Sequence, residues 1–208
     1  METKFFLVRH GQSIGNLLRV YLGHTDLGLS ELGLLQAEKT AEALSGEKID
    51  LIYSSDLKRA YETALPHAKI RGLSVQTSPE LRELYIGKWE GAKISDLERD
   101  FYDEFVLGWL GDFGNFTFPG GESVLAGGER LYREIKKIAE ENPGKTVLIA
   151  AHAAVIKSFW CKISKIHPDD MASAVPIPTN ASYSTFVYDG VDFIPEKFSC
   201  DDHLKDEK

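Results

Sequence analysis

The stretch Lys4-Phe5-Phe6-Leu7-Val8-Arg9-His10-Gly11 decides the fold, because an unbroken apolar run ends here in charged and polar residues. An apolar run of strand length that does not alternate with polar residues is typical of a strand buried on both faces of a parallel sheet. Residues 49–53 and 145–150 repeat the pattern, and segments with helical spacing lie between the runs. The sequence therefore predicts an α/β fold, a three-layer α/β/α sandwich with a mostly parallel sheet.

Residues that commonly cap helices mark where the intervening helices begin. Ser30 precedes apolar residues spaced by three and four positions, of which Leu34 is the first, and Asp56 precedes a segment that carries Arg59. We expect each of these two residues to cap its helix. Further helices are expected from about residue 121 to Pro143 and over residues 155–163, and a hairpin over residues 183–194.

The chain has 208 residues, which is the size of one domain, so residues 1–208 are predicted to form a single unit. Residues 88–118 interrupt the alternation of strands and helices, since they are rich in aromatic residues, Asp, Glu and Gly. We interpret this segment as an inserted, mainly helical cap. The polar tail, residues 199–208, is expected to be frayed.

The charge and composition exclude several classes of function. A net charge of −8 makes the chain a poor binder of nucleic acid or anionic membranes, because both need a basic face. Two widely spaced cysteines form no disulfide framework, and no apolar run is long enough to cross a membrane. We expect a soluble, cytoplasmic protein whose partner is a small molecule, and a homo-oligomer is compatible with the sequence.

Two histidines follow two of the predicted buried strands. His10 ends the first strand and His152 ends the one over residues 145–150, and each precedes a helix or a Gly-containing loop. Ligands of open α/β sheets bind at this edge, where helix N-termini offer free N–H groups to an anion. Arg9 adds a planar cation that suits phosphate, and Arg59 begins a helix at the same edge. Each residue alone has an ordinary structural explanation, such as a solvated arginine, and only the combination favours a phosphate site.

In combination, the motifs resemble the histidine phosphatase superfamily, also called the phosphoglycerate-mutase-like family. The resemblance extends from residue 4 to about residue 196, with the motifs in the family's order. The chain departs from the family pattern at Ala153-Ala154, where glycine is usual, and at Gly15, where tryptophan is usual. The matching motifs are Arg9-His10-Gly11 with Ser13 and Asn16, Ser55-x-Leu57-x-Arg59-Ala60-x-x-Thr63-Ala64, Glu83-x-x-x-Gly87-x-Trp89-Glu90-Gly91, Pro119-Gly120-Gly121-Glu122-Ser123, His152, and Pro178-Thr179-Asn180.

The resemblance implies a mechanism in which His10 attacks a phosphoryl group and becomes a phosphohistidine, while Glu83 acts as acid and then as base. Arg9, Arg59 and His152 would surround the phosphoryl oxygens with positive charge, so no metal or other cofactor is expected. The resemblance also assigns substrate-binding roles, in addition to those of the catalytic residues, to Ser13, Asn16, Gly23 and the backbone of Ala153.

Three functions agree with this resemblance, and hydrolysis of phosphate monoesters is favoured. A phosphoglycerate-type mutase is the first alternative, but in that branch a basic, His-containing stretch follows the acid/base residue, and here Leu84-Tyr85-Ile86 follows Glu83. A non-catalytic binder of phosphorylated ligands is the second, although such a protein has no need of Glu83. Phosphate release from a generic aryl phosphate would separate the enzyme from the binder.

Overall fold

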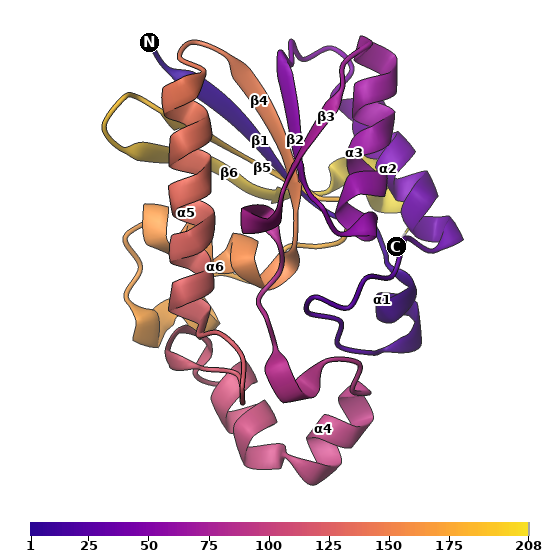
Figure 1. The fold of residues 1–208 in the computed structure, drawn as a ribbon, viewed down its shortest axis with the longest axis vertical. Coiled ribbons are helices and arrows are strands. Elements are labelled where there is room, and N and C mark those ends of the chain that lie inside the picture. The colour runs from indigo at the N-terminus through magenta and orange to yellow at the C-terminus, as the bar shows by residue number, and fades with distance from the viewer. Residues whose placement is uncertain (208) are drawn as a thin grey trace.

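The computed structural model describes residues 1–207 and contains one six-stranded sheet with the strand order β3-β2-β4-β1-β5-β6 (Figure 1). The four strands from β3 to β1 run parallel to one another, and β5 and β6 add an antiparallel hairpin at the β1 edge. The mostly parallel sheet that the sequence predicts is thus confirmed. The strands are β1 (Thr3–Arg9), β2 (Leu51–Ser55), β3 (Val75–Ser78), β4 (Thr146–Ala151), β5 (Tyr183–Tyr188) and β6 (Phe193–Cys200).

Both faces of the sheet are covered, which explains why its central strands do not alternate with polar residues. Along β1, Phe5 and Leu7 pack into one apolar cluster, and Phe6 and Val8 pack into a second cluster on the opposite face. Successive side chains of a strand point to opposite faces, so an all-apolar strand needs a layer on each side. The molecule is therefore the three-layer α/β sandwich expected from the sequence.

The two helical layers come from different parts of the chain. The helices α2 (Glu31–Ala43) and α3 (Lys58–Arg71) cover one face, and α5 (Val124–Glu141) and α6 (Ala153–Ile163) cover the other (Figure 1). Ser30 caps α2 as predicted, accepting a hydrogen bond from the Gly33 N–H. Leu34, however, is 49% exposed, since the buried face of α2 is made of smaller residues and Gln36.

The segment between β3 and α5 forms short helices that lie beyond one end of the sheet (Figure 1). They include α4 (Ile94–Asp100) and helical turns over Gly87–Trp89, Asp103–Leu110 and Phe113–Asn115. Within this cap, Trp89, Phe105 and Trp109 are buried and join the apolar cluster of α5 and α6. Two remaining short helices, α1 (Ile14–Leu18) and α7 (Met171–Ala174), flank the same end of the sheet.

The capping prediction for α3 is wrong. The N-cap of α3 is Leu57, and the N–H of Lys58 donates to the Asp26 carboxylate at 2.7 Å. Asp56 instead forms a two-pronged ion pair with Arg82, at 2.7 and 2.5 Å, which lowers the pKa of Asp56. A paired Arg–carboxylate fork is stronger than a single cap bond, so the carboxylate turns away from the helix.

The prediction of a frayed tail is also wrong for most of residues 199–208. Ser199 and Cys200 belong to β6, and a helical turn over Asp202–Glu207 packs against α2. Leu204 is 2% exposed, and a hydrogen bond of 2.9 Å joins the His203 ring to the Thr40 hydroxyl. Leu204 and the His203 ring thus anchor the tail to the body of the molecule, while residue 208 lies outside the described part of the chain.

Candidate active site

The pairing of β1 with β4 brings the two sequence-predicted histidines together. Arg9 pairs with Ala151 in the parallel register, and the N–H of His10 donates to the Ala151 carbonyl at 3.0 Å. His10 and His152 therefore leave the sheet side by side, with ring centroids 5.2 Å apart and planes at 60°. The spacing of neighbouring strands is close to this separation, so the sheet itself sets the distance between the rings.

The hydrogen bond of the His10 ring fixes which nitrogen carries the proton. Nδ1 lies 2.7 Å from the Gly11 carbonyl oxygen, which can only accept, so Nδ1 is the donor. Burial, together with the charges of Arg59 and Arg9, holds the pKa of His10 well below its ordinary value. The ring is therefore neutral near pH 7, and its Nε2 carries a free lone pair, as a nucleophile requires.

His152 has the opposite tautomer. Its Nδ1 accepts a hydrogen bond from the Arg59 Nε–H at 3.2 Å, so the proton is on Nε2. Burial and the neighbouring Arg59 hold the pKa of His152 well below its ordinary value, and Nε2 has no partner among residues 1–207. A buried donor without a partner is costly unless a ligand satisfies it, so the Nε2–H is available to a phosphoryl oxygen.

Two guanidinium groups supply the positive charge of the site. Arg59 is 2% exposed and is held by the carbonyls of Gly23 and Thr25, at 2.7 and 3.0 Å from its two terminal nitrogens. Arg9 donates to the Pro178 carbonyl at 2.5 Å, and its Nε has no partner in the described chain. Burial lowers the pKa of Arg9 to about 10, so the group is still a cation at neutral pH.

Glu83 lies opposite the histidines, at the N-terminus of α6. Its carboxylate accepts hydrogen bonds from the N–H groups of Leu84, Ala154 and Val155 at 3.0 to 3.1 Å. Among the described residues, it is the one carboxylate that lines the cavity at this end of the sheet. Glu83 is thus the carboxylate that a ligand in this cavity would meet.

The smaller predicted site residues differ in whether their polar groups are already hydrogen-bonded within the protein or are free to bind a ligand. The Ser13 hydroxyl and N–H both bond to Asn16 in the cap of α1, so Ser13 shapes the loop. Asn16 uses its Oδ1 there and has its side-chain N–H groups free for a ligand. The Gly23 carbonyl holds Arg59, and the Ala153 N–H has no partner among residues 1–207.

A cavity of about 440 Å³ connects these groups to the cap. Arg9, His10, Arg59 and Glu83 line its inner end, and His152 lies beneath them against His10 and Arg59. The outer walls are mainly apolar and come largely from the cap. They include Ile86, Trp109, Leu110, Phe113, Phe118 and Ile177.

Residues 5–201 match the histidine phosphatase superfamily, branch 1. The chain belongs to this superfamily. It is 32% identical over 161 residues to phosphoserine phosphatase 1 of Hydrogenobacter thermophilus, covering 77% of this chain and 76% of that one. It is 34% identical over 161 residues to phosphoglycerate mutase-like protein 4 of Arabidopsis thaliana, covering 76% and 70%. A mycobacterial glucosyl-3-phosphoglycerate phosphatase solved with VO3 superposes with a TM-score of 0.88 at 28% identity, covering 95% of this chain and 99% of that one. The histidine phosphatase fold and family expected from the sequence are thereby confirmed.

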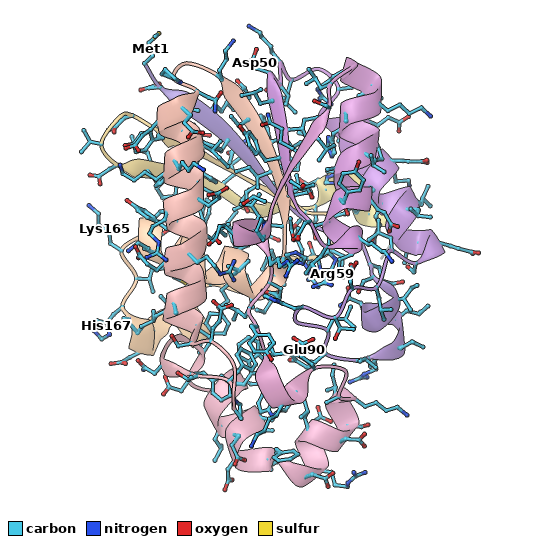
Figure 2. The ribbon with its side chains drawn as sticks, in the orientation of Figure 1. Met1, Asp50, Arg59, Glu90, Lys165 and His167 are labelled. Atoms are coloured by element: carbon cyan, nitrogen blue, oxygen red, sulfur yellow. The ribbon has the colours of Figure 1, made fainter. Side chains whose placement is uncertain are left out.

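In this superfamily member, sequence reasoning missed the residues that hold Arg59 in place. The Glu90 carboxylate accepts from the N–H groups of His24 and Thr25, both at 2.8 Å, and from the Thr25 hydroxyl at 2.6 Å. The loop so fixed presents the two carbonyls that bind Arg59, and Glu90, near the start of the cap, lies below Arg59 in Figure 2. Glu90 stands in the quoted Glu83 motif, but its spacing alone gives no sign of this role.

The sequence also showed no sign of the residues that hold the turn carrying Glu83. Arg130 donates to the carbonyls of Arg82 and Glu83, at 3.0 and 3.1 Å, and pairs with Glu122 at 3.0 Å. His24, for which the motifs indicate no role, contacts the Glu83 carbonyl through its Nε2 at 2.8 Å. The turn that carries Glu83 is therefore held from both sides, which fixes the direction of its side chain.

The described chain contains no cluster of three or more His, Cys, Asp or Glu side chains arranged to hold a metal ion. Within residues 1–207, no helix has both the length and the apolar character that crossing a membrane requires.

Proposed function

We propose that this protein hydrolyses phosphate monoesters of small molecules through a phosphohistidine on His10, without a metal ion. The single observation that carries the proposal is the fixed tautomer of His10. Its proton is on Nδ1, bound to the Gly11 carbonyl, so the Nε2 lone pair faces a site that two arginines make cationic. Family membership and the phosphatases among the relatives support the same reaction class.

In the first step, the Nε2 lone pair of His10 attacks phosphorus and the bond from phosphorus to the ester oxygen breaks. A protonated Glu83 gives its proton to the departing oxygen, so an alcohol leaves rather than an alkoxide. Arg9, Arg59 and the Nε2–H of His152 bind the non-bridging oxygens, whose charge must be stabilised in the transition state. The Nδ1–H bond to Gly11 stays intact and keeps the ring oriented.

In the second step, a water oxygen attacks phosphorus as Glu83 accepts one of its protons. The N–P bond breaks, inorganic phosphate leaves, and the lone pair returns to Nε2. Glu83 is then protonated again and ready for the next ester. The same residue thus acts as acid and as base, which its position at the mouth of the phosphate site allows.

A mutase activity is the second candidate, and the similarity to a phosphoglycerate mutase-like protein is the observation that favours it. A mutase must hold a bisphosphorylated intermediate while water is excluded. Here Leu84 and Ile86 are buried on either side of the exposed Tyr85, so the stretch after Glu83 offers no cation to retain such an intermediate. Hydrolysis is therefore the proposed main reaction.

Mass spectrometry and phosphate release test the proposal together. Wild-type protein mixed with an aryl phosphate and quenched without acid should gain one phosphoryl group on His10, and the His10→Ala variant should gain none and release almost no phosphate. Turnover close to normal in that variant would disprove the role of His10. Phosphate binding without release in the wild type would favour the non-catalytic binder, and interconversion of phosphoglycerate isomers faster than phosphate release would favour the mutase.

A further inference from the structure

A buried lysine lines the cavity away from the reacting groups. Lys157 lies on α6, is 4% exposed, and is among the cavity-lining residues. Nothing in the proposed chemistry of His10 and Glu83 uses it. A charged side chain that is almost fully buried needs a partner, so the surroundings of its ammonium group indicate what it binds.

The partners of Lys157 within the described chain leave its charge without a counter-ion. Its Nζ donates to the Ala172 carbonyl at 3.2 Å and lies 4.5 Å from the centre of the Phe113 ring. An ammonium has three N–H donors, and no carboxylate among residues 1–207 forms an ion pair with this one. Burial lowers the pKa of Lys157, against a smaller opposing contribution from Cys161.

The helix places this ammonium on the same wall as the phosphate end. Ala153 and Lys157 are four residues apart on α6, so they share a face and are separated by about 6 Å along the axis. Both residues line the same cavity, and the Ala153 N–H has no partner in the described chain. A ligand whose phosphate lies at Ala153 therefore presents its remaining atoms to Lys157.

The rest of the cavity decides the kind of ligand. Its outer walls are largely apolar, with Trp109, Phe113 and Ile177 among them, and Glu83 is the one lining carboxylate in the described chain. An apolar or ring segment of a substrate fits between the phosphate end and Lys157, and the exposed Arg19 is a further cation that lines the cavity. A ligand with an ammonium at this position would find no carboxylate besides that of Glu83. A ligand with a second phosphate dianion here would bring more negative charge than one lysine neutralises.

We propose that Lys157 binds a carboxylate of the substrate, and that the enzyme prefers phosphate monoesters in which an apolar or ring segment joins the phosphate to a carboxylate. This inference rests on the proposed phosphatase function and names its substrate class. Lys157 is then a specificity residue: it contacts the part of the substrate that leaves with the alcohol.

A series of aryl phosphates tests the preference with nearly constant leaving groups. The kcat/KM values for 3- and 4-carboxyphenyl phosphate are compared with those for phenyl, 4-(hydroxymethyl)phenyl and 4-(aminomethyl)phenyl phosphate. We expect the better carboxylate isomer to exceed the phenyl ester by about 10- to 100-fold, as a hydrogen bond between charged groups contributes. The aminomethyl ester should be the poorest substrate.

The variants are Lys157→Met, which keeps the length without the charge, and Lys157→Arg, which keeps the charge. Lys162→Met, an exposed position on the same helix paired with Glu129, is the matched control. Lys157→Met should remove the preference for the carboxylate while the phenyl ester is hydrolysed about as well as before, and Lys157→Arg should retain much of it.

An equal loss on every ester in Lys157→Met would assign Lys157 a purely structural role, and an unchanged preference would also overturn the inference. If the wild type hydrolyses none of the esters, the phosphatase proposal fails by itself. In that event, calorimetric affinities of the phenyl and carboxyphenyl esters for the His10→Ala variant, with and without Lys157→Met, decide the inference separately.

Discussion

The replacement Glu90→Gln tests whether Glu90 fixes the position of the Arg59 guanidinium through the loop that lies between them. The Glu90 carboxylate holds the loop that carries His24 and Thr25 through three hydrogen bonds of 2.6 to 2.8 Å, and the Gly23 and Thr25 carbonyls of that loop hold Arg59. Glutamine has the same shape but only one acceptor oxygen. In either orientation of the amide, its NH₂ group therefore faces the backbone N–H of His24 or of Thr25, and two donors cannot form a hydrogen bond.

The magnitude follows from counting these bonds. If the amide oxygen of the new glutamine bonds to Thr25, the hydrogen bond from the His24 N–H is lost and the other two lose their charge. A hydrogen bond to a charged group contributes about 1.5–3 kcal/mol, and a neutral one contributes about 1 kcal/mol. The total is about 2.5–7 kcal/mol, which sets an upper limit of about 70- to 10⁵-fold on the loss in kcat/KM if all of it reaches the transition state through Arg59.

A double-mutant cycle with Arg59→Lys separates this route from a general loss of stability. Glu90→Gln should lower kcat/KM for an aryl phosphate strongly in the wild-type background and by less than about threefold in the Arg59→Lys background, because the guanidinium is then absent. Glu141→Gln, at the exposed end of α5, is the control and should change neither value. Equal losses in both backgrounds would refute the argument that Glu90 acts through Arg59.

Three further outcomes are expected. Glu83→Gln should lower kcat/KM by about 10²–10⁴-fold for an alkyl phosphate but only modestly for 4-nitrophenyl phosphate, whose leaving group needs no proton; equal losses would exclude Glu83 as the acid. Excess EDTA should leave the rate unchanged while vanadate inhibits, since its five-coordinate form resembles the transition state; a rate lost to EDTA and restored by a divalent ion would contradict the proposed metal independence. Burial lowers the pKa of His67 to about 3, so between pH 6.5 and 3 the unfolded chain binds the proton and stability falls as the pH falls. His67→Leu should reduce the loss of unfolding free energy between pH 7 and pH 4 by about 3 kcal/mol, measured by urea denaturation, and an unchanged loss would show that His67 is accessible to protons in the folded state.

The sheet and the convergence of the candidate site residues at one of its edges were predictable because they depend on local patterns. Buried parallel strands are recognised by their unbroken apolar runs, and their carboxyl ends meet at one edge, which places His10 beside His152. Arg59 follows from the same argument, since its helix begins at that edge. The short edge strand β3 has no such run and was not predicted, because only four residues with polar neighbours form it.

Interactions between distant segments could not be predicted from the sequence. Asp56 had two uses, as a helix cap or as a partner of Arg82, and only the folded chain brings Arg82 within reach. Glu90 and Lys157 look like ordinary surface charges in the sequence, and their roles depend on a loop and a cap that approach them from elsewhere. His67 is buried within α3, and neither of its ring nitrogens has a hydrogen-bond partner in the described part of the chain, which no motif in the sequence indicates.

The register between β1 and β4 has a consequence for how such a protein can diversify. Because the Arg9–Ala151 pair fixes both histidines through main-chain bonds, the separation of the two rings does not depend on which side chains occupy the cap. Substitutions over residues 92–118, a range that leaves out Glu90, can therefore alter what is recognised without moving His10. A one-residue slip of β4 against β1 has no such tolerance, since it turns every buried side chain of the strand to the opposite layer and separates the two rings at once. Recognition and reactivity are thus free to evolve at different rates in the same short chain.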